Sequence, residues 1–266
     1  MDRETLIEKA GQMAAARVTD AMDKDEKMDV LEIAMMELLD IQIMKPTLGR
    51  IGTFASGGPG PASGRWLMGD DPRLPKMPEK PNLMDFYRNR IMLDGRGANH
   101  LLQSAKLAKE NGAPEKLVLA CLLHDISVVG FIRSDHGHWA SQLLAPYVDE
   151  EVAWAIKHHQ SLRFLPAPDY GFEYPGLYTM AFGEDYEPPD HIKQEWDYCR
   201  DHKWYGSAMQ IVVNDLYAFD PDTVVELDEF EDIIGRHFKQ PAEGLGFDAS
   251  PVAHMWRTMI WPNNFL

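Results

Sequence analysis

A histidine and an aspartate stand side by side where an apolar stretch ends, because His124 and Asp125 close the segment LVLACLLHD. Both side chains bind divalent metals, although such a dipeptide by itself is common. Further imidazoles and carboxylates flank the pair, namely His100, His136, His158, His159 and Asp215. A closed zinc site needs only four ligands, so this larger set suits two divalent metals that share a bridging carboxylate.

Two places in the sequence offer alternative histidine ligands. His136 competes with His138, and we favour His136 because apolar residues follow it at helical spacing, which turns it inward. His158 competes with His159 in the segment AIKHHQ. We predict that His158 is the ligand and that His159 either donates a hydrogen bond to the ligands or contacts the substrate.

The ligand types restrict the metal and its location. Imidazole and carboxylate together favour iron, manganese, nickel, cobalt or zinc over calcium. Neighbouring side chains on a helix point about 100° apart, so His124 and Asp125 can face one cavity with Asp125 between two metals. The other ligands must then come from different helices, as in metal sites inside helix bundles. Gln103 follows His100 by three residues on the same helix face and could support the ligands.

The composition is that of a globular protein with 266 residues, 45% hydrophobic residues and a formal net charge of −16. This acidity argues against binding to nucleic acids or anionic membranes, since both require a basic surface. The 2 cysteines are too few for a disulfide framework. The N-terminal segment MDRETLIEKAG lacks the apolar core of a signal peptide, and the apolar run before His124 is too short to span a bilayer. We therefore expect a cytoplasmic protein with a small-molecule substrate.

Helical periodicity and the scarcity of alternating strand patterns predict an all-α fold. The predicted helices cover roughly residues 4–18, 24–44, 100–110, 114–125, 136–144, 152–160 and 191–219. Asn99, Asp135 and Asp149 are candidate N-caps. The last helix would deliver Asp215 to the metal site.

Two segments are too rich in Gly and Pro, or in Pro and aromatic residues, to form long regular elements. Residues 45–82 form either a linker that wraps the domain or a lid over the pocket, and residues 166–189 form an irregular insertion. We predict three regions: 1–83 with N-terminal helices and the arm, 84–240 with the metal-binding core, and 241–266 as a tail packed on that core. The methionine-rich helix over 24–44 and the arm are compatible with a homodimer.

The motifs around these ligands resemble the HD-domain superfamily of metal-dependent phosphohydrolases and related oxygenases. They are HLLQSAKLAKENGA, ACLLHDI, DHGHWASQLL, IKHHQSLRFL and VVNDLYAFD, which together span about His100 to Asp215. The chain looks most like the small HD-domain oxygenases that degrade organophosphonates and, more distantly, myo-inositol oxygenase. This resemblance implies a helical bundle with the ligands His100, His124, Asp125, His136, His158 and Asp215, in which Asp125 bridges the metals.

The resemblance also implies the cofactor and the reaction. Two iron ions in a mixed-valent Fe(II)/Fe(III) state would use O2 to cleave or hydroxylate a small polar substrate, whereas Mn, Ni, Mg or Zn are the alternative metals. The alternative reaction is hydrolysis of a nucleotide or small phosphoester by a metal-activated water. A third hypothesis is a partner-binding module without activity, which an intact set of six ligands disfavours.

Several departures from the superfamily's patterns bear on the substrate. Many HD phosphohydrolases continue the His-Asp pair with a lysine that holds phosphate, but this chain reads HDISVVG and has no Lys or Arg before Arg133. Cyclic-dinucleotide hydrolases can carry a glutamate where this chain has Arg96. The phosphonate oxygenases carry a lysine shortly after the fourth histidine, where this chain has Leu162 and Arg163. Arg163 is either a clamp for an anionic substrate or a surface arginine.

Overall fold

The computed structural model describes residues 3–22, 27, 30, 34, 75–93, 95–130, 135–173, 179–180, 183 and 186–260. Across these ranges the chain forms helices and no strand, apart from one isolated bridge between Ala167 and Phe172. The all-α prediction is therefore confirmed. Most of the helix predicted over 24–44, most of the arm predicted over 45–82, and part of the insertion over 166–189 lie outside the described residues. None of the described helices is long and apolar enough to cross a membrane.

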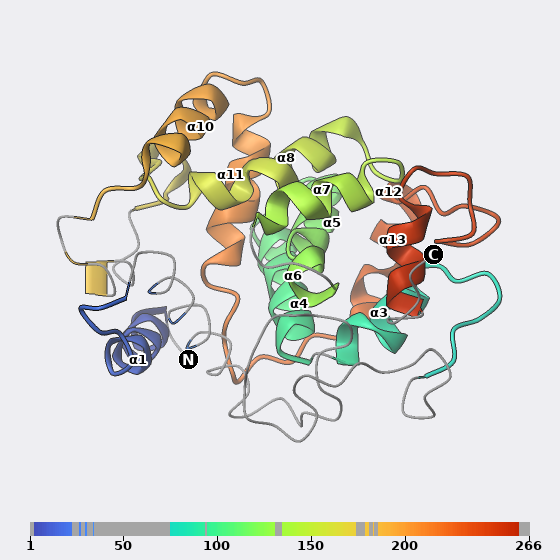
Figure 1. Cartoon of the computed structure of the whole chain (residues 1–266), viewed down its shortest axis with the longest axis horizontal. Coiled ribbons are helices and arrows are strands. Elements are labelled where there is room, and N and C mark those ends of the chain that lie inside the picture. The colour runs from blue at the N-terminus through green and yellow to red at the C-terminus, as the bar shows by residue number, and fades with distance from the viewer. Residues whose placement is uncertain are drawn as a thin grey trace.

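The helices follow one another in the order shown in Figure 1. The α-helices are α1 (Arg3–Ala15), α3 (Leu83–Asn89), α4 (Gly95–Glu110), α5 (Glu115–Leu123), α6 (Ile126–Gly130), α7 (His136–Leu144), α8 (Glu150–Leu162), α10 (Asp190–Arg200), α11 (Tyr205–Asp215), α12 (Glu231–His237) and α13 (Ala253–Ile260). Three short 3-10 turns join them: η1 (Ile91–Leu93), η2 (Pro168–Tyr170) and η3 (Leu227–Phe230).

Helix α5 is the buried centre of the bundle. Every residue from Leu117 to Leu123 is buried, and α5 contacts α4, α8, α11 and α12. A helix that is apolar on all sides is stable only when other helices surround it. His124 and Asp125, which follow α5 directly, are consequently placed in the interior.

The segment predicted as one helix over 191–219 is two helices, α10 and α11, joined by a turn at 201–204. In this turn the backbone N–H of Trp204 donates to His202 Nδ1. A continuous helix of that length would extend about 40 Å at 1.5 Å per residue. The turn instead lets α11 pack along α8, α4 and α5, which brings Asp215 back to the middle of the bundle.

Helix α4 begins earlier than predicted. It starts at Gly95, so Asn99 lies inside the helix rather than at its N-cap. Asp135 and Asp149 do precede α7 and α8 as predicted, but neither side chain forms a capping hydrogen bond. Packing of the apolar faces therefore sets these helix ends more than capping does.

The C-terminal region closes the bundle on the side of α3. The ring of Trp256 in α13 is fully buried and packs at 4.8 Å between ring centroids against Phe86 in α3. Arg90 donates from Nε to the carbonyl of Met259 and from Nη2 to that of Ile260. Trp256 is thus part of the core and secures the end of the described chain.

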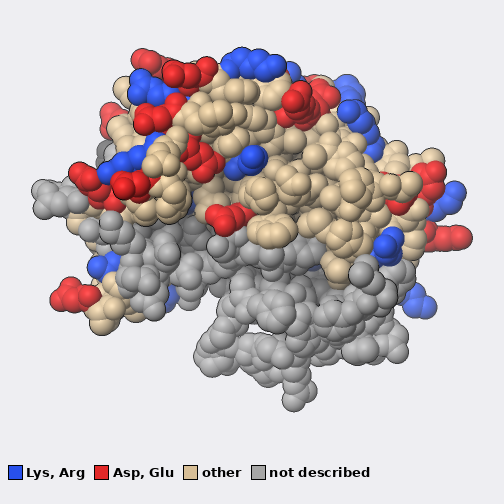
Figure 2. Space-filling view, turned by 45° about the horizontal axis from the view of Figure 1, so that its top comes forward, with Lys and Arg blue, Asp and Glu red and all other residues tan. Residues whose placement is uncertain are grey.

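Acidic and basic side chains share the face of the molecule that Figure 2 shows. On the face shown in Figure 2, acidic and basic residues are intermingled around a broad uncharged area, and the described residues there form no extended basic patch. A nucleic-acid-binding surface would need such a patch.

Candidate metal centre

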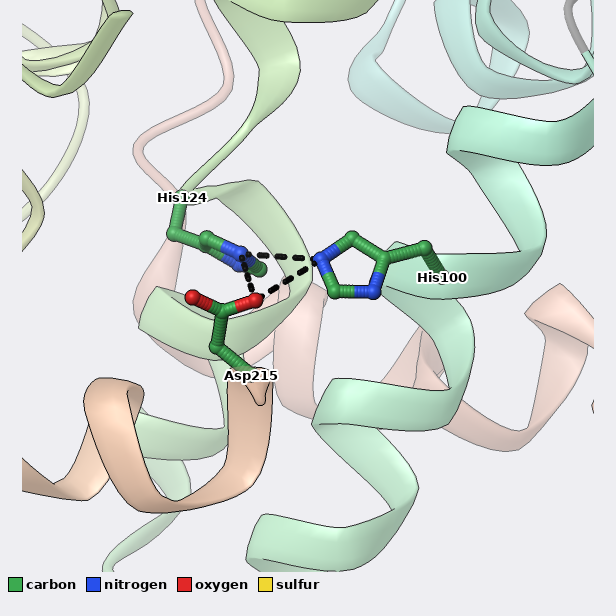
Figure 3. A group of neighbouring side chains, drawn as sticks. All are labelled: His100, His124 and Asp215. Atoms are coloured by element: carbon green, nitrogen blue, oxygen red, sulfur yellow. Dashed lines mark hydrogen bonds and ion pairs between the residues drawn. The ribbon is translucent and has the colours of Figure 1, made fainter. Parts of the chain in front are cut away.

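Three side chains from three helices converge at the centre of the bundle (Figure 3). His100 comes from α4, His124 follows α5, and Asp215 ends α11. His100 Nε2 lies 3.1 Å from Asp215 Oδ1 and 3.3 Å from His124 Nε2. His124 Nε2 lies 3.6 Å from the same Asp215 oxygen. Each residue thus turns one potential ligand atom toward a common point.

A second group lies next to the first and is built from α7 and α8. His136 Nε2 lies 3.2 Å from His159 Nε2. Asp125 Oδ1 lies 3.2 Å from His136 Nε2 and 3.5 Å from His159 Nε2. All three residues are buried.

The Asp125 carboxylate connects the two groups, because it lies near imidazoles of both. Oδ1 lies 3.2 Å from His136 Nε2, 3.5 Å from His159 Nε2 and 3.6 Å from His124 Nε2, whereas Oδ2 lies 3.7 Å from His100 Nε2. A carboxylate in this position can give one oxygen to each of two metal ions. Such bridging is the arrangement expected for six ligands shared by two ions.

Backbone carbonyls fix the orientation of three of the four imidazoles. His100 Nδ1 donates to Ala218 O at 3.1 Å, His124 Nδ1 to Cys121 O at 2.7 Å, and His159 Nδ1 to Ile156 O at 2.6 Å. When the proton resides on Nδ1, Nε2 keeps its lone pair for a metal. The backbone thus holds each ring with its ligand nitrogen toward the centre.

The arrangement fits bound cations. Two pairs of Nε2 atoms face each other at 3.3 Å and 3.2 Å, and imidazoles that are neutral with the proton on Nδ1, as metal binding requires, would turn both lone pairs of each pair toward a shared ion. Asp125 Oδ1 is buried and accepts no hydrogen bond. Unsatisfied buried acceptors are costly, and one divalent cation at each pair would satisfy these atoms.

The protonation states also reflect this crowding. Burial raises the pKa of the Asp125 carboxyl, but the neighbouring imidazoles lower it more strongly. The resulting pKa lies well below the usual range of an aspartate. Burial alone would lower the pKa of His124, but Asp125 and Asp215 raise it to about 9. Burial, with His124 and His136 nearby, lowers the pKa of His159 to about 4. The centre therefore holds ionised carboxylates and a neutral His159 at neutral pH.

A close crossing of α7 and α8 positions the second group. A Cβ atom at Gly137 would lie 2.8 Å from the carbonyl oxygens of Ile156 and Lys157, and 3.4 Å from His159 Cε1. Only a glycine allows the helices to approach so closely at this point. Gly137 was not predicted as a site residue, although it lies next to His136 in the sequence.

The structure places His158 and His159 differently from the prediction. His159, not the favoured His158, lies in the metal centre, whereas His158 Nδ1 lies 2.8 Å from Glu195 Oε1 in α10. The helical periodicity of α8 could have predicted that His159 points inward. Val152, Ala155 and Ile156 are buried, and position 159 lies on the same helix face. For the other pair, His136 is buried and His138 is exposed, in line with the prediction.

Gln103 does not reach the ligand atoms. Its Nε2 donates to the carbonyls of Asp220 and Thr223, and its Oε1 accepts from the backbone N–H of Asp220. The amide therefore fastens the loop after α11, and the same loop supplies the Ala218 carbonyl that orients His100. Gln103 is placed to position a ligand rather than to contact a metal or substrate.

Arg163 follows α8 and is buried, with 8% of its side chain exposed. Its Nη1 lies 3.9 Å from Asp215 Oδ2. Burial raises the pKa of Asp215, but Arg163 and the imidazoles of His100 and His124 hold it well below the usual range. Of the two hypotheses for Arg163, the structure contradicts the exposed surface arginine.

A cavity of about 530 Å³ lies between α4 and α11 beside the centre. Its walls include Gln103, Lys106, Asn111, Asn214 and Tyr217. No ligand candidate lines it. The cavity is therefore separate from the space between the metal-binding atoms.

Comparison with protein families identifies an HD domain at residues 97–200. The match includes His100, His124, Asp125, His136 and His159, and it ends before Asp215. No curated protein matches the chain significantly. The HD-domain match supports membership of the HD-domain superfamily and, with the His/Asp groups, indicates a metal-dependent enzyme.

Proposed function

We propose that this protein is a dinuclear HD-domain oxygenase that uses two iron ions and O2 to oxidise a small polar substrate. The observation that carries the proposal is the position of Asp125, whose carboxylate lies between two groups of ligands and within 3.7 Å of an imidazole of each. His100, His124 and Asp215 would hold one ion, and His136 and His159 the other. Asp125 would bind both.

Iron bound here would supply Lewis acidity toward substrate oxygens and one-electron chemistry with O2. The chain supplies the surroundings of that chemistry. All six ligands are buried, so bulk water is largely excluded and electrostatic interactions in the centre are strong. The Nδ1 contacts to Ala218, Cys121 and Ile156 keep the imidazoles from turning as charge changes at the centre.

The position of Arg163 favours an anionic or strongly polar substrate. Its guanidinium is buried beside Asp215 and can present a planar fork of donors to a carboxylate, phosphonate or phosphate group. The adjacent carboxylate keeps this cation compatible with burial. The side chain would orient the substrate at the ion held by His100, His124 and Asp215.

Hydrolysis of a phosphoester is the second candidate, because the same ions could activate water and Arg163 could equally bind a phosphoryl group. The sequence offers few other cations near the centre, since the segment after Asp125 reads ISVVG. Oxygen chemistry is the better-supported of the two because it depends less on a basic phosphate site.

Metal content and oxygen uptake test the proposal together. Protein purified without chelators should contain about two irons per chain and give a coupled mixed-valent EPR signal after partial oxidation. Small carboxylates, phosphonates and polyols are then screened for substrate-dependent O2 consumption, with phosphate release measured in parallel. Phosphate release from phosphoesters without O2 uptake, with Mn or Mg as the most active metal, would refute the oxygenase and establish the hydrolase.

A further inference from the structure

A second cluster of metal-binding side chains lies where α8 packs against α10, outside the His/Asp centre. His158 comes from α8, and Glu195 and Cys199 come from α10. One potential ligand atom from each residue lies within 4.8 Å of the other two. Glu195 and Cys199 are four residues apart and therefore share one face of their helix. Three ligand types that zinc accepts are thus gathered at one helix–helix contact.

We propose that His158, Glu195 and Cys199 form a separate binding site for a thiophilic divalent cation such as zinc. The cysteine distinguishes this site from the main centre, whose candidates are imidazoles and carboxylates only. Thiolate with imidazole selects zinc or similar soft cations over magnesium, calcium or manganese. The inference does not depend on the reaction at the main centre.

The ligand atoms, all within 4.8 Å of one another, would have to shift by about 1 Å or less to reach tetrahedral spacing. In a tetrahedral site with bonds of about 2.0–2.3 Å, the ligand atoms are about 3.3–3.8 Å apart. His158 Nδ1 and Glu195 Oε1, now hydrogen-bonded at 2.8 Å, would separate by roughly half an ångström to admit the ion. The imidazole proton would move to Nε2 and the Cys199 thiol would release its proton to solvent, so that nitrogen, carboxylate and thiolate face the cation.

The surroundings keep the site ordered and accessible. The Trp154 ring packs on His158 with 4.5 Å between centroids and stacks on His202 at 4.1 Å, which restrains the His158 ring. Cys199 is fully buried, whereas 34% of the Glu195 side chain is exposed. An ion can enter past Glu195, where a water can occupy the fourth position as in open zinc sites.

Cobalt(II) is a selective probe because only thiolate ligands give a near-ultraviolet sulfur-to-cobalt charge-transfer band. The full-length protein is stripped with chelator and titrated with Co²⁺. Co²⁺ will also fill the main centre, which has no thiolate, so we expect the band to saturate at the intensity of one thiolate-bound cobalt per chain, and Zn²⁺ to abolish it by displacement. Cys199→Ser should remove the band, and Cys121→Ser, which changes the other cysteine, should retain it.

Glu195→Gln is the second variant, since it changes a partly exposed residue with almost no change in shape. It should weaken Co²⁺ binding at the thiolate site by roughly 10-fold or more. Circular dichroism checks that each variant is folded. Absence of the band in the wild-type protein, or its persistence in Cys199→Ser, would overturn the proposal and leave the His158–Glu195 contact as a clamp between helices.

Discussion

His158 and His159 are adjacent in the chain, yet their imidazoles belong to different clusters. His159 Nε2 lies 3.5 Å from Asp125 Oδ1, and His158 Nδ1 lies 2.8 Å from Glu195 Oε1. Neighbouring positions on a helix point about 100° apart. Helix α8 therefore directs His159 toward the main centre and His158 toward α10.

This divergence predicts different effects of matched substitutions. His159→Gln should reduce the metal content of the main centre and abolish activity, because it removes one of the two imidazoles proposed for the second ion. His158→Gln should retain both ions and most of the activity. Metal analysis and turnover of the two variants check this. Loss of the ions in His158→Gln with retention in His159→Gln would contradict the proposed ligand set.

The contact at Gly137 predicts a large effect from a single methyl group. Gly137→Ala would place Cβ 2.8 Å from the carbonyls of Ile156 and Lys157, which forces α7 and α8 apart. We expect a loss of about 1–3 kcal/mol in the free energy of unfolding, together with weaker metal binding because His136 and His159 separate. Denaturant unfolding and metal titration measure both quantities.

Gly235→Ala is the matched control, because Gly235 lies in α12 with nothing within 4 Å of an added Cβ. Alanine is favoured over glycine inside helices by up to about 1 kcal/mol, so this variant should be as stable as the wild type or more so. Equal stability of the two alanine variants would show that the helix crossing at Gly137 is not tight.

Metal binding is predicted to release protons. Burial lowers the pKa of His124, but Asp125 and Asp215 outweigh this effect and raise the pKa to about 9. The His124 imidazole of the metal-free protein is therefore protonated at neutral pH. A metal requires the neutral imidazole, and binding near pH 7 should release about one proton from His124. Apparent affinity should rise about tenfold per pH unit up to about pH 9. Calorimetry in buffers of different ionisation enthalpy measures the proton count, and a count of zero would contradict the assignment.

The stability of the metal-free protein should also depend on pH. The folded pKa of His124 is raised from 6.5 to about 9, so its contribution is present below pH 6.5 and is lost as pH rises through 9. The folded pKa of His159 is lowered from 6.5 to about 4, so folding becomes less favourable as pH falls through that range. These two groups together predict greatest stability near pH 6.5, measurable by denaturant unfolding across pH. Stability that rises steadily from pH 6.5 to 9 would contradict the pKa of His124.

Arg163 is predicted to act on substrate binding. Arg163→Lys keeps the positive charge beside Asp215 but loses the fork of donors, so KM for an anionic substrate should rise about tenfold or more with a smaller change in kcat. Arg163→Gln should raise KM further. Steady-state kinetics for anionic and neutral substrates check this, and an equal effect on both kinds would argue against an anion clamp.

Much of the fold could be predicted from the amino-acid pattern alone. The apolar run Leu117–Leu123 indicates a buried helix, and its burial carries His124 and Asp125 into the interior. His136, at the start of an amphipathic helix, was predicted correctly as the buried member of its pair. The break between α10 and α11 was not predicted, because residues 201–204 contain no proline or glycine that would indicate the end of a helix.

The residue types and their order along the chain therefore determined the all-α fold and the presence of a His/Asp metal centre, since burial periodicity and ligand chemistry are local properties. Only the tertiary structure decided which member of the His158–His159 pair faces that centre, and that Gln103 holds a loop instead of a ligand. These choices depend on helix rotation and on contacts between residues more than a hundred positions apart, such as Gln103 with Asp220, and packing of the whole bundle sets both.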